Sequence, residues 1–265
     1  MLEKIHSLDL LSLSAVHLEE SSTEVMLTNE TFTGVHQDDP ALVSYLRHQL
    51  APPSALPYNL TNPEKEDFSQ FGQSLHLLQY LPHTLKTGVF VEVGALDGEY
   101  LSNSLYLERH LGWSGLLIEP YPVSYKQLLS KHRKAYSVNA ALSVTNVSSN
   151  VMLRPDGDLG VLSQLAEDGV PVKAFPLYTF LLALQVSVVD FFSLDVEGVE
   201  VKVLKTIPWD KVKFRLLCIE VNHIPEGQEA LRVFMESKGY KHLGLRDVDS
   251  WFGYPELLAQ TAAGN

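Results

Sequence analysis

The sequence contains a single cysteine, Cys218, among its 265 residues. An intramolecular disulfide is therefore impossible, which excludes a small secreted scaffold held together by disulfides. Cys218 lies in an apolar run between Arg215 and Glu220, and free cysteines are among the most frequently buried residues. We expect a buried, inert thiol here, and a reactive thiol is the alternative.

Basic residues are also scarce. Lysine and arginine number 20 against 32 aspartates and glutamates, which gives a formal net charge of -12. Because phosphate backbones attract basic surfaces, this balance argues against a nucleic-acid partner. The composition is otherwise that of a soluble globule, with 45% hydrophobic and 20% charged residues, and it argues against wholesale disorder.

Long apolar runs are missing as well. The most apolar stretch, residues 179–194, contains Gln185 and Asp190 and falls short of the roughly 18 to 20 apolar residues of a membrane span. The N-terminus carries acidic residues and lacks the cationic-then-apolar layout of a signal peptide. We therefore expect no membrane span in this chain and, on the visible sequence, a cytoplasmic location.

A secretory location is the alternative, if an N-terminal anchor is missing from this chain. Three sequons for N-glycosylation, at Asn29, Asn59 and Asn146, would matter only in that case.

Several catalytic motifs are absent. The sequence has no H-E-x-x-H and no paired C-x-x-C, so a zinc hydrolase or zinc finger is not indicated. It has no G-x-S-x-G elbow and no phosphate-binding G-x-x-x-x-G-K-[ST] loop, which disfavours hydrolases and P-loop enzymes.

What the chain does contain is an alternation of apolar strands with helices from about residue 88 onward. This alternation predicts an α/β fold with a mostly parallel sheet and helices on both faces. Residues 1–65, rich in turn-forming residues, are expected to be an N-terminal extension, partly helical or irregular, in front of a domain spanning residues 66–265. The expected strands are 88–93, 115–118, 136–138, 186–194, 214–221, 240–245 and 250–252, and the expected helices are 39–50, 68–81, 123–131, 177–184, 199–206 and 226–238.

A glycine turn and an acidic residue follow the first two strands. Gly94 and Gly98 come directly after the first strand, and Glu119 ends the second strand about 20 residues later. Glycines permit a tight turn and close approach of a ligand, and an acid in that place can accept hydrogen bonds from both ribose hydroxyls of a nucleoside. The spacing is not G-x-G-x-x-G, so a dinucleotide enzyme is disfavoured.

A second acidic group follows the fourth and fifth strands. Asp195 ends the fourth strand and Glu197 follows it, while Glu220 ends the fifth strand shortly before His223. A carboxylate or imidazole in the crevice between these strands can orient a substrate hydroxyl or take its proton. A divalent metal on Asp195, Glu220 and His223 is an alternative, but no tight ligand motif is present and we predict no metal site. Glu200 is expected on a solvated helix face.

Four blocks of the sequence resemble S-adenosylmethionine-dependent methyltransferases of the FkbM type. They are Val-Glu-Val-Gly-Ala-Leu-Asp-Gly (91–98), Leu-Gly-Trp-Ser-Gly-Leu-Leu-Ile-Glu-Pro (111–120), Val-Asn-Ala-Ala-Leu-Ser (138–143) and Ser-Leu-Asp-Val-Glu-Gly-Val-Glu (193–200). The sequences of these blocks also resemble the animal Star-like subset of that family. The chain departs from many bacterial members, in which the first loop reads Gly-Ala-Asn-x-Gly, because Leu96 and Asp97 replace the Asn-x pair.

This resemblance implies a Rossmann-like class I methyltransferase sandwich that binds S-adenosylmethionine. Asn103 is implied near the methionine carboxylate, and a helix-cap role is its alternative. The residues implied to bind the cofactor are Glu92, Gly94, Ala95, Asp97, Gly98, Asn103, Glu119, Pro120, Asn139, Ala140 and Ala141.

The leading hypothesis for function is an O-methyltransferase acting on a hydroxyl of a small-molecule, sugar or lipid-linked acceptor, with Asp195, Glu197, Glu220 and His223 as catalytic candidates. The alternative is a catalytically silent methyltransferase-fold binding module in secretory-pathway trafficking, since fold alone does not settle function. A nucleotide-sugar or dinucleotide enzyme is a third hypothesis. The sequence does not indicate an oligomeric state.

Overall fold

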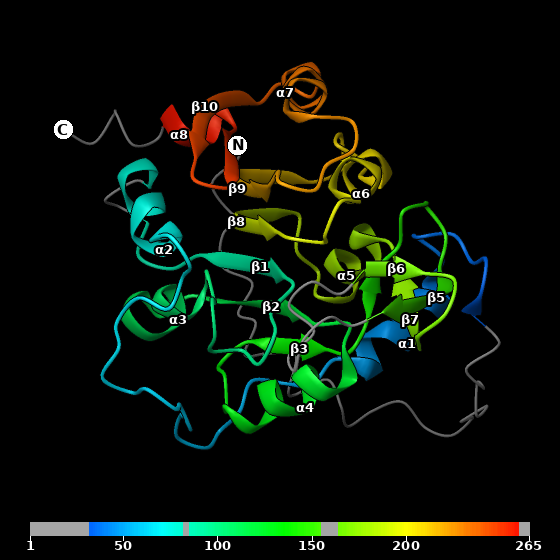
Figure 1. Cartoon of the computed structure of the whole chain (residues 1–265), viewed down its shortest axis with the longest axis horizontal. Helices are drawn as coiled ribbons and strands as arrows, with labels where there is room; N and C mark the ends of the chain where they lie inside the picture. The colour runs from blue at the N-terminus through cyan, green and yellow to red at the C-terminus, as the bar shows by residue number, and fades with distance from the viewer. Residues whose placement is uncertain (1–31, 82–84, 155–163, 260–265) are drawn as a thin grey trace, which may run out of the picture.

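A seven-stranded sheet forms the centre of the computed structural model, which describes residues 32–81, 85–154 and 164–259 (Figure 1). The strands lie in the order β10-β11-β9-β8-β1-β2-β3. All neighbouring pairs are parallel except those of β11, which runs antiparallel to both β9 and β10. The bounds are β1 Val89–Val93, β2 Ser114–Ile118, β3 Tyr136–Val138, β8 Val188–Leu194, β9 Lys213–Glu220, β10 Lys241–Arg246 and β11 Asp249–Gly253. The mostly parallel sheet expected from the sequence is confirmed.

The chain changes direction of winding between β1 and β8. From β1 the chain builds outward through β2 and β3, and it then returns to place β8 and β9 on the other side of β1. In open parallel sheets, ligands bind beyond the carboxyl ends of the strands at such a switch point. The order of the strands therefore directs attention to the residues that follow Val93 and Leu194.

Helices cover both faces of this sheet, because alternate residues of its strands point to opposite sides. Phe90 and Phe191 pack on one face with α3, α4 and the helical turns α2 and η4, whereas Val91 and Phe192 pack on the other face with α1, α5, α6 and α7. The bounds are α1 Pro40–Gln49, α2 Gln73–His76, η4 Leu77–Tyr80, α3 Leu105–Leu111, α4 Pro122–Ser130, α5 Leu177–Ala183, α6 Glu200–Thr206, α7 Gln228–Ser237 and α8 Pro255–Ala259. No helix among the described residues is long and apolar enough to cross a membrane.

A second, four-stranded sheet was not expected from the sequence. It has the order β4-β7-β5-β6 and starts with β4 (Ala141–Leu142), which follows β3 after two residues. Its other strands are β5 Ser149–Arg154, β6 Gln164–Ala166 and β7 Val170–Phe175. Leu142 of β4 and Leu153 of β5 bring this sheet to the edge of the candidate site.

The described part of the expected N-terminal extension packs onto the domain. Asp39 caps α1 by accepting hydrogen bonds from the backbone N–H groups of Ala41 and Leu42, a role that aspartate commonly takes at the start of a helix. Leu42 and Leu46 of this helix are fully buried in the core shared with β1 and α5. Ala51 exchanges backbone hydrogen bonds with Ser137 and so covers the edge of β3. Residues 1–31 lie outside the described residues.

One expected helix was wrong, and one helix was missed. The helix expected over residues 68–81 is reduced to α2 and η4, because Gly72 adopts a left-handed conformation (φ 76°) that no α-helix contains. The seven-residue helix α3 was not expected, although its buried Leu105 and Leu107 anchor it to the sheet. Both segments are short, so local sequence carries little periodic signal for them.

Candidate active site

A pocket of about 190 Å³ lies at the carboxyl ends of β1, β2, β8 and β9. One half is lined by residues after β1, β2 and β3, including Gly94, Glu119 and Ala140. The other half is lined by residues after β8 and β9, including Asp195 and His223. The pocket therefore joins the two groups of residues that the sequence singled out separately.

Seven of the eleven residues implied to bind the cofactor line this pocket. They are Glu92, Gly94, Asn103, Glu119, Pro120, Ala140 and Ala141. Ala95, Asp97, Gly98 and Asn139 are not among the lining residues. Of these, Asp97 accepts hydrogen bonds from the backbone N–H groups of Glu99 and Tyr100, and Asn139 donates to the backbone carbonyls of Glu119 and Pro120. These two side chains shape the loops behind the pocket.

Gly94 is required by the contact between the first loop and the end of β8. Its φ is 81°, and a Cβ added there would lie 2.6 Å from the backbone oxygen of Asp195. Leu96 also has a positive φ, 47°, a conformation that Asn adopts more readily than Leu. The Asn expected from the bacterial pattern would thus suit this position, and Leu96 holds the same backbone shape at some cost in strain.

Glu119 is fixed by the backbone on both sides of its carboxylate. One oxygen accepts from the N–H of Leu96 and the other from the N–H of Tyr121, each at 2.8 Å. The residue is 2% exposed, and burial raises the pKa of Glu119 to about 8 against the opposing effect of these two hydrogen bonds. Each oxygen keeps a second lone pair, so the carboxylate can accept two further hydrogen bonds from a ligand.

Glu92 belongs to a buried polar network. Its carboxylate accepts from the N–H of Asn103 and from the hydroxyls of Ser102 and Ser104. Arg133 binds Ser102 and Ser104 from the other side and pairs with Glu108 at 3.1 Å. Burial raises the pKa of Glu92 even though the Arg133 charge opposes it. This network fixes the loop that presents Asn103 to the pocket.

Asn103 carries a buried oxygen with no hydrogen-bond partner among the described residues. Its amide nitrogen donates to the Ser193 hydroxyl at 2.9 Å, while Oδ1 is unpartnered. Buried polar atoms are normally hydrogen-bonded, so an orphan in a pocket wall indicates a missing donor. A ligand with an N–H or O–H group near Asn103 would supply it.

All four catalytic candidates line the second half of the pocket. Asp195 stays accessible to solvent there and has no hydrogen-bond partner among the described side chains. Glu197 Oε2 lies 2.8 Å from His223 Nδ1, and Glu220 Oε2 lies 3.9 Å from the same nitrogen. Gly198 makes this proximity possible, because a Cβ there would lie 2.7 Å from the backbone oxygen of His223.

The carboxylates raise one another's pKa values. Crowding by protein atoms, followed by the charges of Glu197 and Glu220, raises the pKa of Asp195 well above its usual range. Burial is also the main cause of the raised pKa of Glu197 and of Glu220, and the His223 charge opposes it in both. Such shifts cluster at functional sites.

The expectation for Glu200 was wrong. This side chain is fully buried and accepts hydrogen bonds from the backbone N–H groups of Val196 and Gly198, so it folds back onto the turn after β8. Asp249, at the start of β11, was not singled out by the sequence; it lines the pocket and accepts from Gln73 at 2.8 Å. Its position depends on β11 lying beside β9, where Asp249 is paired with Glu220.

The profile of the methyltransferase FkbM domain matches residues 92–242. The match covers more than half of the chain, and the chain belongs to the FkbM methyltransferase family. It starts at Glu92 and includes every catalytic candidate. No curated protein matched the chain.

Two solved structures are similar to parts of the chain. One is methyltransferase FkbM from Methylobacillus flagellatus KT, with 15% identity, a TM-score of 0.44, and coverage of 81% of this chain and 58% of that chain. The other is M. capricolum TrmK in complex with S-adenosyl-homocysteine, with 9% identity, a TM-score of 0.39, and coverage of 71% and 70%. The chain thus spans 58% of the length of the Methylobacillus protein.

Proposed function

We propose that the protein binds S-adenosylmethionine in this pocket and transfers its methyl group to a hydroxyl of a neutral acceptor. The observation that carries the proposal is Glu119, a buried carboxylate at the end of β2 that lines the pocket and whose two oxygens are fixed by backbone N–H groups. In an FkbM methyltransferase domain, that place suits the ribose of the methyl donor. The donor supplies a methyl group bound to a sulfonium, and the chain supplies binding and orientation.

The residues of the first half fit the cofactor. Glu119 would accept hydrogen bonds from the ribose hydroxyls, and Asn103 Oδ1 would accept one from the amino group of the methionine end. The side chains of Pro120, Ala140 and Leu142 offer an apolar wall for the adenine. Because Gly94 has no side chain, the cofactor could approach the backbone closely at this position, next to Asp195.

The second half would hold the acceptor. Asp195 lines the pocket with no hydrogen-bond partner among the described side chains, and its raised pKa makes it a stronger proton acceptor than an ordinary aspartate. Glu220 would orient the acceptor hydroxyl, and the Glu197–His223 pair would hold a second polar group of the acceptor. Most of the rate enhancement would come from holding the two reactants in line.

Charge restricts the acceptor. Among the described residues that line the pocket, six are acidic and none is lysine or arginine. An acceptor with a phosphate or carboxylate beside the reacting hydroxyl would meet like charges and lose affinity. We therefore expect a neutral sugar or polyol hydroxyl, whether free or carried on a lipid.

Calorimetric titration of S-adenosylmethionine into the full chain tests the proposal. We expect a dissociation constant on the order of 10 µM, and loss of binding in Glu119→Ala. Glu226→Ala, at an exposed position outside the pocket, is the matched control and should bind normally. Absence of binding to a chain that is folded by circular dichroism, or equal binding by Glu119→Ala, would refute the proposal.

The silent binding module remains the competing function, supported by the resemblance to the Star-like subset. Such a module would need no open site beside the methyl donor. None of residues 32–65, the described part of the expected extension, lines the pocket, and this favours an enzyme. Methyl transfer from labelled donor to neutral sugars decides between the two, since the silent module would transfer none.

A further inference from the structure

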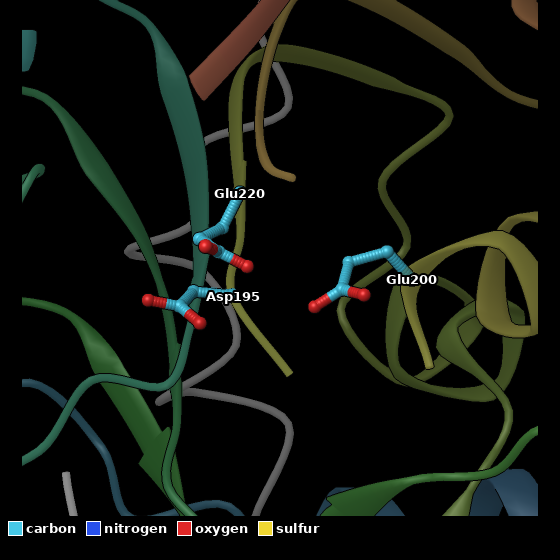
Figure 2. Close-up of side chains that lie close together, drawn as sticks. All are labelled: Asp195, Glu200 and Glu220. Atoms are coloured by element: carbon cyan, nitrogen blue, oxygen red, sulfur yellow. The ribbon is translucent and has the colours of Figure 1, made fainter. Parts of the chain in front are cut away.

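Three carboxylates from different elements converge beside the second half of the pocket, which Asp195 and Glu220 line. Asp195 follows β8, Glu200 begins α6 and Glu220 ends β9. One carboxylate oxygen of each residue lies within 4.8 Å of one oxygen of each of the other two, and Figure 2 shows the three side chains close together. Three like charges at this distance repel one another unless a cation or protons compensate them.

A second observation indicates which kind of compensation is missing. Glu220 is 7% exposed, and its Oε1 accepts from the N–H of Asn222 at 2.7 Å, whereas its buried Oε2 has no hydrogen-bond partner among the described residues. In Figure 2 the Glu220 carboxylate lies next to that of Asp195 and points toward Glu200. A buried carboxylate oxygen that accepts no hydrogen bond inside an anionic cluster is suited to a positively charged ligand.

The side chains around the cluster do not provide that charge. His223 Nδ1 lies 3.9 Å from Glu220 Oε2 but only 2.8 Å from Glu197 Oε2, so its nearest partner is outside the three. Asp249 adds another acid on the neighbouring strand. No ion pair with lysine or arginine reaches the three carboxylates from any described residue.

We propose that Asp195, Glu200 and Glu220 bind one hard divalent cation, with Ca²⁺ preferred over Mg²⁺. All three donors are carboxylate oxygens, which suit hard cations. Ligands on opposite sides of Ca²⁺ are about 4.6 to 5.2 Å apart, and those of Mg²⁺ about 4.1 Å apart. Oxygens within 4.8 Å of one another can surround either ion, but Mg²⁺ is usually held by one or two carboxylates and several waters, so a set of three protein carboxylates favours Ca²⁺.

This site differs from the metal alternative raised by the sequence, because Glu200 replaces His223. It also changes the role of Asp195, which becomes a ligand when the cation is bound. A bound cation would neutralise the cluster and could hold an acceptor hydroxyl; that consequence rests on the proposed function, but binding of the cation does not.

Calcium binding by the full, chelator-treated chain tests the site. Isothermal titration in about 0.15 M salt should give one Ca²⁺ per chain, with Mg²⁺ binding at least about tenfold more weakly, and Mn²⁺ should give a bound electron paramagnetic resonance signal that Ca²⁺ displaces. Asp195→Asn and Glu220→Gln should each weaken Ca²⁺ binding by at least about tenfold. Glu226→Gln, at an exposed position, is the matched control and should leave binding unchanged.

Asp195→Asn keeps the test decisive, because Asp195 makes no hydrogen bond to a described side chain and its replacement should not unfold the protein. No binding, several equivalent weak sites, or unchanged affinity in a folded Asp195→Asn chain would overturn the site. Calcium binding without S-adenosylmethionine binding would refute the proposed function and support the cation site. S-adenosylmethionine binding without calcium binding would refute the cation site and support the proposed function.

Discussion

The protonation of Glu119 should control nucleoside affinity. Burial raises the pKa of Glu119 to about 8 in the ligand-free protein, whereas two ribose hydroxyls can both donate only to the ionised carboxylate. Binding of a ribose must therefore release the proton, and affinity should rise with pH until the carboxylate is ionised. Unlike most acids, this one binds its proton more tightly in the folded state, so its contribution to stability is full below pH 4.5 and is lost as pH rises through about 8.

The magnitude follows from the position of the pKa. At pH 6 about one carboxylate in 100 would be ionised, and at pH 9 about nine in ten. Apparent affinity should then increase about 90-fold between these two pH values, which corresponds to about 2.7 kcal/mol. At pH 7 each bound ligand should release about 0.9 proton.

Adenosine is the suitable probe, since it carries the ribose and base but none of the ionisable groups of the methionine end. Calorimetric titrations in buffers of different ionisation enthalpy give both the affinity and the released protons. 2′-Deoxyadenosine is the matched ligand control and should show a smaller pH dependence, and the Glu119→Gln chain should show none. Adenosine binding that is independent of pH and releases no proton would refute the assignment of Glu119 to the ribose.

Three further predictions concern the framework of the site. Gly94→Ala should lower the free energy of unfolding in urea by roughly 2 kcal/mol or more, because its Cβ meets the Asp195 carbonyl. Gly112→Ala, with open space around it, should lower it by about 1 kcal/mol, and equal losses in the two variants would contradict the contact. Arg133→Met should cost about 3 to 5 kcal/mol, since it leaves the buried Glu108 carboxylate unpaired, and a change below about 1 kcal/mol would show that water replaces the arginine. Burial raises the pKa of the Cys218 thiol well above its usual value, so a thiol reagent should label it only as fast as the protein unfolds, and rapid labelling of the native chain would contradict its burial.

The central sheet could be predicted from the sequence because its strands carry their own signal. Residues 88–93 and 186–194 are short apolar runs bounded by glycine or polar residues, typical of strands buried on both faces. Asp39 followed by Pro40 marks the start of α1 for an equally local reason. In each case the segment's own residues define its structure, and tertiary contacts only reinforce it.

The second sheet could not be predicted in the same way. Only part of β7 alternates clearly, with Val172 and Ala174 turned inward, and β4 contains two residues. Its pairing depends on contacts such as Met152 with Ala166 and Ser149 with Ala174. Strand pairing between segments this short is decided by tertiary packing, which one sequence does not reveal.

The acid cluster was predicted only in part, for a related reason. Asp195 and Glu220 end parallel strands, and the rule that such ends share one edge of a sheet brings them together. Glu200 was misplaced because a charged residue at a helix start is usually solvated, and its inward turn depends on the backbone of Val196 and Gly198. Asp249 enters through the antiparallel strand β11, whose place beside β9 no local pattern indicates.

Three other buried acids of this chain are neutralised by ion pairs, unlike the cluster of Asp195, Glu200 and Glu220. Glu108 is paired with Arg133, Asp190 with Arg215 and Glu99 with Lys131, each within 3.1 Å. In these three places the fold supplies an internal cation, whereas the buried Glu92 and Asp249 accept hydrogen bonds from uncharged groups. At the edge where Asp195, Glu200 and Glu220 meet, no described lysine or arginine is supplied, so compensation there must come from protons, from a sulfonium or from a metal ion. Each of these three is a ligand or a reaction partner, and this distinguishes the cluster from the structural ion pairs elsewhere in the chain.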